Sequence, residues 1–296
     1  MKDVMLSPRA KAAVALALDE DLVSVERVRA TPRCDATSLA LVDPKAVATG
    51  EIYSKGTGCV VSGATVARAV FRAVDPSIKV KILRPDGSTV RPKEPILVFR
   101  GKARSILAAE RTALNFMQRM SATATLASRF VAATKRYGTL ILDTRKTTPG
   151  LRVFEKYAVT CGGGTNHRMG MYDRILMKDN HRRLWKGGNP DELDQAVIAA
   201  RKRFPKLAVE VEVESLRECR SALKAKPEWI MLDNMSVADM RKCVKLCRGI
   251  SKTEASGGIT LERAREVAAT GVTAISLGCL THSAGSIDLS LEWRAV

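Results

Sequence analysis

Hydrophobic positions follow one pattern in the first part of the chain and another in the rest. Up to about residue 135, the apolar spacing predicts a helix over residues 8–19, strands over 78–83 and 96–101, and helical structure over 103–135. The last segment suits either one long helix or two helices with a break near Ser121. This part shows no repeated strand–helix unit.

After Gly138, short apolar strands alternate with amphipathic helices, which is typical of a parallel sheet or an α/β barrel. The predicted strands cover residues 139–142, 174–177, 207–211, 229–232, 251–255 and 273–277. The helices predicted between them include residues 191–202, 236–246 and 261–269. We therefore expect an α/β fold whose second part is a barrel.

The charge balance indicates an anionic partner. The 296 residues include 49 Lys and Arg against 31 Asp and Glu, which gives a net charge of +18. Nucleic acid, a membrane surface and small phosphorylated molecules all suit such an excess. Aromatic residues make up only 4%, and the cations are spread along the chain rather than interleaved with stacking rings. A non-catalytic nucleic-acid-binding protein is therefore the weaker interpretation.

The cysteines and the hydropathy favour a protein of the cytoplasm. Seven cysteines are scattered without CxxC spacing, as in a reducing compartment. Cys243 and Cys247 share a helix face, but no histidine or second cysteine pair accompanies them, so we expect helix packing rather than a metal site. No apolar run is long enough to span a membrane, and residues 1–20 resemble an amphipathic helix rather than a signal peptide.

The residues that follow each predicted strand are the candidates for function, because the active site of a parallel barrel forms at the carboxyl ends of its strands. Six predicted strand ends carry polar or glycine clusters, at residues 143–146, 178–181, 212, 233–234, 256–258 and 278. Random surface polarity would rarely produce this arrangement.

One group of these candidates is cationic. It contains Arg145, Lys146 and Lys178, joined by His167 and Arg168 from a connecting segment. Arginine binds carboxylates and phosphates through two hydrogen bonds at once, so the group suits a multiply charged anion. For His167 alone, a structural role is the alternative.

Two carboxylates, Glu212 and Asp233, carry the opposite charge. They can serve as ion-pair partners of the cations, or they can hold Mg²⁺ jointly with a polyphosphate. The residues alone favour metal binding but leave both possibilities open.

Glycines follow the last two predicted strands. Residues 256–258 precede a helix, and Gly278 follows the final strand. The backbone N–H groups of such turns can approach a phosphate closely, although ordinary turn glycine is the alternative. Residues 161–168 lack both the GK[ST] ending and the preceding strand of a Walker loop, so a Walker nucleotide site is not expected.

Eight segments carry a family resemblance: residues 110–115, 143–150, 155–159, 161–168, 177–181, 209–212, 232–234 and 254–259, with weaker similarity at 34–37. In this order they resemble the quinolinate phosphoribosyltransferase family. Eight ordered motifs are far more specific than any one of them. The chain departs from the family pattern at residues 121–125, where a glycine is usual, and at Met171, where leucine is usual.

The resemblance implies a role for each candidate. It implies that the two quinolinate carboxylates bind to Arg145, His167, Arg168 and Lys178, with Arg111 donated by the partner subunit of a homodimer. It implies that 5-phosphoribosyl 1-pyrophosphate (PRPP) binds to Lys146, Glu212, Asp233, Ser256, Gly257, Gly258 and Gly278. Glu212 and Asp233 would also hold Mg²⁺, and the catalytic residues would be Lys146, Lys178, Glu212 and Asp233.

The implied fold is that of a type II phosphoribosyltransferase. It has an N-terminal α/β sandwich-like domain over residues 1–115, an incomplete parallel α/β barrel over 116–283, and a C-terminal segment over 284–296 that returns to the first domain. The implied reaction gives nicotinate mononucleotide, CO₂ and pyrophosphate from quinolinate and PRPP, in de novo NAD biosynthesis. The rivals with the same fold use another acceptor, such as nicotinate, or belong to the relatives encoded with molybdenum transporters. Five candidate cations favour a dicarboxylate.

Overall fold

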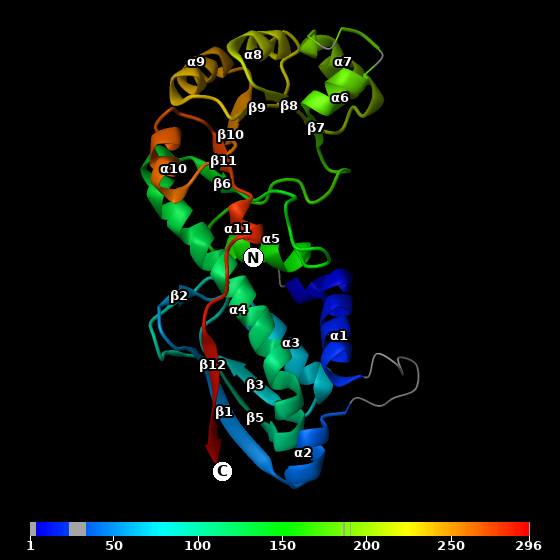
Figure 1. The fold of residues 1–296 in the computed structure, drawn as a ribbon, viewed down its shortest axis with the longest axis vertical. Helices are drawn as coiled ribbons and strands as arrows, with labels where there is room; N and C mark the ends of the chain where they lie inside the picture. Colours follow the sequence, from blue (N-terminus) through cyan, green and yellow to red (C-terminus); the bar gives the residue numbers. More distant parts are fainter. Residues whose placement is uncertain (1–3, 24–33, 186, 190, 296) are drawn as a thin grey trace. The chain divides into compact units, whose positions relative to one another are not determined.

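The computed structural model describes residues 4–23, 34–185, 187–189 and 191–295, which form two compact units (Figure 1). Unit 1 contains the chain up to Ser128, residues 147–163, and the chain from Leu280 onward. Unit 2 contains residues 129–146 and 164–279.

These units do not follow the expected boundaries. The boundary expected at residues 115 and 116 lies inside α4 (Ala103–Thr134), which is a single helix without a break at Ser121. Residues 147–163 and 280–283 belong to unit 1 and not to the barrel. The change of hydrophobic pattern near Gly138 marks where the parallel strands begin, whereas the units divide further upstream, inside the long helix.

Unit 1 is built on an antiparallel sheet with the strand order β12–β1–β5–β3. Its strands are β1 (Val47–Ser54), β3 (Lys79–Ile82), β5 (Pro95–Lys102) and β12 (Leu289–Ala295), and β2 (Cys59–Val60) and β4 (Thr89–Val90) form a separate pair. The last strand of the chain pairs with β1 from Ser54 to Ala48. The C-terminal segment therefore completes the N-terminal sheet.

The helices of unit 1 are η1 (Val4–Leu6), α1 (Pro8–Leu22), α2 (Ala36–Leu41), α3 (Ala64–Val74) and α5 (Arg152–Cys161), together with most of α4. All of them except α2 contribute residues to an apolar core that they share with the sheet. Phe71 of α3 stacks on Phe99 of β5 with ring centroids 5.4 Å apart. The predicted first helix is confirmed, and every fourth residue from Ala10 to Leu22 is buried, which is the stripe of an amphipathic helix.

Small polar residues of α4 explain the unusual sequence at residues 121–125. The N–H of Ser62 donates to Ser121 Oγ at 3.1 Å, and the N–H of Val60 donates to Thr125 Oγ1 at 2.9 Å. Both hydroxyl groups lie on buried residues. Since a buried N–H without an acceptor is costly, these side chains stabilise the packing of β2 on the helix.

Unit 2 is a six-stranded parallel sheet with the order β6–β11–β10–β9–β8–β7. Its strands are β6 (Leu140–Leu142), β7 (Ile175–Met177), β8 (Val209–Val213), β9 (Trp229–Asp233), β10 (Lys252–Ser256) and β11 (Ala274–Ser276). Its helices are α6 (Asp179–Leu184), α7 (Leu193–Arg203), α8 (Leu216–Leu223), α9 (Val237–Cys247) and α10 (Leu261–Ala268), with η3 (Lys135–Tyr137) before β6. Helix α11 (Cys279–His282) follows β11 and belongs to unit 1 from its second residue onward. Helices α6 to α10 lie outside the strands, as in a barrel (Figure 1). All six predicted strands are confirmed, and β8 runs two residues beyond its predicted end.

The segment that follows Gly164 runs along the free edge of β6. The N–H of Thr165 donates to the carbonyl of Ile141 at 2.8 Å, and the N–H of His167 donates to Asp143 Oδ1 at 2.9 Å. Residues 165–167 therefore extend the edge of this incomplete barrel and carry His167 into its interior. Within the described parts of the chain, no helix is long and apolar enough to cross a membrane.

Candidate functional site

The register of the parallel strands places several predicted residues on one face of the sheet. Glu212 pairs with Met231, and Ser256 pairs with Asp233. Paired residues of neighbouring strands point to the same side, and so do residues two apart along one strand. Glu212, Asp233 and Ser256 therefore share one face near the carboxyl ends of their strands.

Lys178 and Glu212 bind each other at this rim. Lys178 Nζ lies 2.8 Å from Glu212 Oε2. The lysine side chain is 45% exposed and that of Glu212 only 9%. The prediction that Glu212 follows its strand was wrong, because β8 extends through Val213 and holds Glu212 within it. A cation and a carboxylate that were assigned to different ligands thus form one ion pair.

The end of β9 is locked against the turn after β10. The N–H of Asn234 donates to the carbonyl of Ser256 at 3.0 Å, and the Asn234 side chain donates to Asp233 Oδ2 at 2.8 Å. At Gly257, with φ +98°, a Cβ atom would lie 2.1 Å from Asn234 Oδ1, so only glycine fits. Gly258 also has positive φ, but no atom lies within 4 Å of the Cβ position, so space for a ligand remains beside it.

Arg145 and Arg168 carry like charges that repel each other. Burial lowers the pKa of Arg168, and the Arg145 guanidinium lowers it further. Arg168 Nη1 donates to the carbonyl of Arg174 at 3.3 Å. A bound anion between the two guanidinium groups would relieve their repulsion.

Two other predicted residues also lie at strand ends. Lys146 is exposed, and its N–H donates to Thr144 Oγ1 at 3.0 Å. Gly278 is half-buried directly after β11, and the preceding Leu277 donates its N–H to the carbonyl of Leu142 at 2.9 Å. The six predicted strand ends therefore belong to one parallel sheet, as the pattern predicted.

His167 lies beneath the rim among buried carboxylates. Its Nε2 lies 3.2 Å from Glu210 Oε2 and 3.4 Å from Glu254 Oε2, and its Nδ1 accepts the N–H of Arg168 at 2.7 Å. Glu210 also pairs with Arg174 Nη1 at 3.1 Å. Glu210 and Glu254 were not among the predicted site residues, although charged residues inside apolar strands indicate a polar interior.

The proton in this cluster has a preferred place. Burial lowers the pKa of His167, but Glu210 and Glu254 outweigh it and bring it to about 9. Burial and Glu210 raise the pKa of Glu254. A ring with this pKa would carry protons on both nitrogens at neutral pH, but a proton on Nδ1 would face the N–H of Arg168, which lies 2.7 Å away. The hydrogen bond therefore favours a single ring proton on Nε2, with the second proton of the cluster on Glu254.

The same hydrogen bond argues against a metal ion at this cluster. Among the residues that the structure describes, His167, Glu210 and Glu254 form the one group of three side chains whose potential ligand atoms lie within 4.8 Å of one another. A metal would need the lone pair of Nε2, which would leave the ring proton on Nδ1. That atom already accepts an N–H, so the group does not fit a metal.

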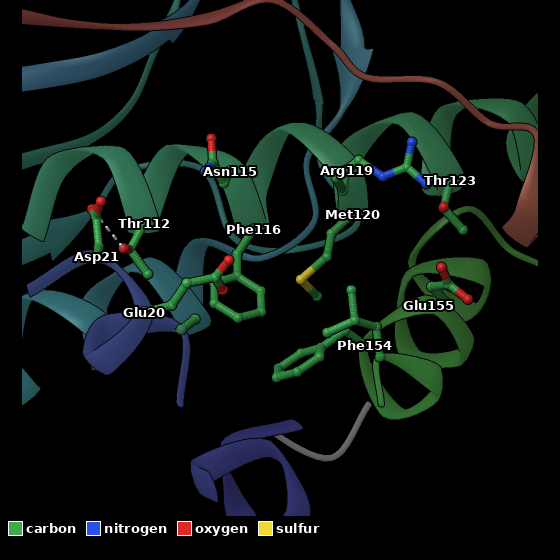
Figure 2. A pocket seen from close by; sticks show the side chains of 12 residues that line it. Glu20, Asp21, Thr112, Asn115, Phe116, Arg119, Met120, Thr123, Phe154 and Glu155 are labelled. Carbon is green, nitrogen blue, oxygen red and sulfur yellow. Dashed lines mark hydrogen bonds between the residues drawn. The ribbon is translucent and has the colours of Figure 1, made fainter. Parts of the chain in front are cut away.

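Arg111 lies in unit 1, exposed on α4. Its helix borders a cavity of about 330 Å³ with apolar walls that include Phe116, Met120 and Phe154 (Figure 2). Three carboxylates, Glu20, Asp21 and Glu155, also line the cavity, whereas the one lining arginine, Arg119, donates to the carbonyl of Gly285 at 2.6 Å. This charge balance does not suit a dianionic ligand.

An α/β barrel with cations, carboxylates and glycine turns at its strand ends defines an enzyme class that acts on small anions. Two family models cover most of the chain: "Quinolinate phosphoribosyl transferase, N-terminal domain" matches residues 35–121, and "Quinolinate phosphoribosyl transferase, C-terminal domain" matches residues 123–292. The chain belongs to the quinolinate phosphoribosyltransferase family.

Individual relatives agree with this membership. The chain is 38% identical over 297 residues to the chloroplastic nicotinate-nucleotide pyrophosphorylase (carboxylating) of Oryza sativa subsp. japonica, covering 95% of this chain and 77% of the relative. It is 40% identical over 243 residues to the probable enzyme of that name from Bacillus subtilis, covering 82% of each. The structure of nicotinate-nucleotide pyrophosphorylase from Francisella tularensis matches with a TM-score of 0.89 and 36% identity, covering 99% of this chain and 100% of that one. The resemblance and the predicted fold class are confirmed.

Proposed function

We propose that this protein transfers the phosphoribosyl group of PRPP to quinolinate and decarboxylates the product to nicotinate mononucleotide. The observation that carries the proposal is the match to the quinolinate phosphoribosyl transferase family, in a chain that places Arg145, Arg168 and the strand-end cation Lys178 in one barrel unit. These residues supply charge for two adjacent carboxylates. The names of the relatives describe the same reaction class.

The reaction needs no nucleophile from the protein. The quinolinate nitrogen forms a bond to C1 of the ribose while the bond from C1 to the pyrophosphate oxygen breaks. The bond between ring C2 and its carboxylate then breaks, CO₂ leaves, and C2 takes a proton. The protein contributes alignment of the two reactants and stabilisation of charge, and Lys146 is proposed to face the departing pyrophosphate.

Glu212 and Asp233 fit a magnesium ion, which stays a proposal. Both offer hard oxygen ligands on one face of the sheet, and Asp233 is only half-buried and so accessible from the rim. Glu212 already binds a cation there, in Lys178. When bound, Mg²⁺ would neutralise charge on the pyrophosphate of PRPP.

The turn after β10 is the proposed site of the PRPP 5′-phosphate, together with Gly278. The open space beside Gly258 supports it, as does the start of α10 three residues later. Backbone N–H groups at a helix N-terminus favour a phosphate, and the helix dipole adds to the attraction. Ser256 supplies a hydroxyl group from the same strand end.

Two further proposals concern the assembly and the compartment. We propose a homodimer in which Arg111 completes the partner's quinolinate pocket; its exposure on α4 leaves it accessible to another subunit. We also propose a cytoplasmic location, because none of the seven cysteines, which all lie in the described part of the chain, forms a disulfide. Plant relatives carry chloroplastic or mitochondrial names, so fractionation of the source cells must test the compartment.

A steady-state assay with quinolinate or nicotinate as acceptor tests the proposed reaction. We expect nicotinate mononucleotide and CO₂ from quinolinate, and little product from nicotinate. Arg145→Ala should raise the KM for quinolinate by about 10-fold or more, since a lost charge-assisted contact costs about 1.5–3 kcal/mol, and should change the KM for PRPP less. Tight, salt-dependent binding of nucleic acid without any transferase activity would instead favour the non-catalytic alternative.

A further inference from the structure

Two glutamates are buried in the interior of unit 2 directly beneath the rim. Glu210 and Glu254 are both 0% exposed, and His167, which lies between them, is 7% exposed. They come from β8 and β10, the two neighbours of β9, and lie two residues before Glu212 and Ser256 on the same face. Burying a carboxylate costs several kcal/mol unless other groups compensate. Apolar residues at these positions would avoid that cost.

One chain of contacts leads from this pair to the backbone of Arg168. Glu210 and Glu254 face Nε2 of His167 at 3.2 and 3.4 Å. This fixes the ring so that Nδ1 accepts the N–H of Arg168 at 2.7 Å. The ring therefore transmits the position of the two carboxylates to the next residue.

A second chain of contacts leads to the guanidinium group of the same residue. Glu210 Oε2 binds Arg174 Nη1 at 3.1 Å, and the Arg174 guanidinium lies 5.2 Å from the centre of the Trp229 ring. The carbonyl of Arg174 accepts Arg168 Nη1 at 3.3 Å. Arg168 is thus held at its backbone and at its side chain, and both contacts trace back to buried carboxylates.

We propose that Glu210 and Glu254 are positioning residues that aim Arg168 at a substrate carboxylate through His167 and Arg174. The identity of that substrate as quinolinate rests on the proposed function. The proposal changes the role implied for His167, because Nδ1 faces the Arg168 N–H and Nε2 faces two carboxylates. In this geometry both ring nitrogens of His167 face groups of the protein, so the histidine can hold Arg168 in position.

Kinetics of two Glu254 variants test the positioning role. Glu254→Leu removes both oxygens, whereas Glu254→Gln keeps one that can accept the Nε2–H. We expect Glu254→Leu to raise the KM for quinolinate by about tenfold, which corresponds to about 1.4 kcal/mol, with the KM for PRPP within about twofold of wild type. Glu254→Gln should have a KM for quinolinate close to that of wild type. Equal effects of Leu and Gln, or equal rises of both KM values, would overturn the proposal.

A double-mutant cycle asks whether the effect passes through Arg168. If Glu254 acts by aiming that guanidinium, Glu254→Leu should change the KM for quinolinate by less than about twofold once Arg168→Ala is present. Full additivity would overturn the proposal. Glu228→Gln is the matched control, since Glu228 directly precedes β9 at the opposite end of the strands. It should leave the KM for quinolinate unchanged.

Nitrogen NMR tests the geometry without reference to any reaction. The chain contains three histidines, at positions 167, 181 and 282, so [¹⁵N]histidine labelling with His181→Gln and His282→Gln identifies each ring. We expect His167 to carry its proton on Nε2 with Nδ1 as an acceptor, and Glu254→Gln to shift its Nε2 signal alone. A proton on Nδ1 of the wild-type ring would overturn the proposal. If this geometry holds but the wild type does not use quinolinate, the positioning stands and the proposed function fails.

Discussion

Replacement of Lys178 by alanine should weaken binding of an aromatic dicarboxylate mainly when Mg²⁺ and PRPP are bound. In the protein without ligands, Lys178 holds Glu212 at 2.8 Å. A dicarboxylate that binds the Lys178 ammonium group would displace Glu212, which is 7% exposed and would be left without its cation. A magnesium ion at Glu212 would remove that cost, because the metal would replace the lysine.

The expected magnitudes differ in the two conditions. With the metal complex bound, loss of Lys178 removes one charge-assisted contact of about 1.5–3 kcal/mol, or about 10- to 150-fold in affinity. Without the metal complex, the ligand carboxylate only replaces the Glu212 carboxylate at Lys178, whose side chain is 45% exposed. The net gain from such an exchange is within about 1 kcal/mol, so the variant should lose about fivefold at most.

Calorimetry with phthalate measures this difference, since phthalate has two adjacent carboxylates but no ring nitrogen to attack PRPP. Its Kd is compared for wild type and Lys178→Ala, with and without Mg²⁺ and PRPP. Lys252→Ala is the control, because Lys252 begins β10 and lies over the Trp229 ring, at the other end of the barrel. An equal loss of affinity in both conditions would refute the idea that the ligand carboxylate displaces Glu212 from Lys178. No loss in either would show that Lys178 does not bind the acid.

Three further outcomes are expected. Asp233→Asn should raise the Mg²⁺ concentration needed for half-maximal activity, and full activity of the wild type in excess chelator would contradict a metal site. A mixture of the inactive variants Arg111→Ala and Lys178→Ala should regain about a quarter of wild-type activity after subunit exchange, because half of the dimers are mixed and half of the sites in a mixed dimer are intact. A mixture that stays inactive would place Arg111 in the site of its own subunit. Burial acts to raise the pKa of Glu228, but hydrogen bonds from the N–H of residue 209 and from Arg201 outweigh it and lower that pKa below 4.5. The stability that this carboxylate adds is then present above pH 4.5 and lost as the pH falls through its lower folded-state pKa. The Tm of Glu228→Gln should therefore lie below that of wild type at pH 7, and the two Tm values should converge in acid. A difference in Tm that does not change with pH would contradict the hydrogen bonds as the cause.

The barrel was more readily predicted than the first domain. Parallel strands buried on both faces give short apolar runs, and the polar residues at their ends mark the rim, so all six strands were found. In strand β1, buried and half-buried positions alternate from Gly50 to Ser54, but two of the three buried residues are Gly50 and Ser54, so no alternation of apolar residues predicted it. Its partners also lie far along the chain, at β5 and β12, which no local pattern can show.

The place of the rim residues at strand ends could be predicted, whereas the cluster beneath them could not. Lys178, Asp233 and residues 256–258 were predicted at strand ends, and the structure places them there; their roles stay predictions. The pairing of Lys178 with Glu212 depends on the exact end of β8, which sequence patterns place only to within a few residues. Glu210 and Glu254 were missed because their role depends on a histidine brought in by a segment between two strands.

The pairing of β12 with β1 has a consequence for synthesis on the ribosome. Residues 47–54 emerge early, but their partner, Leu289–Ala295, is made more than 200 residues later. Until then one edge of β1 has no neighbour, and an unpaired edge can recruit strands from other chains. Nascent chains that stall before residue 289 should therefore be the aggregation-prone species during translation.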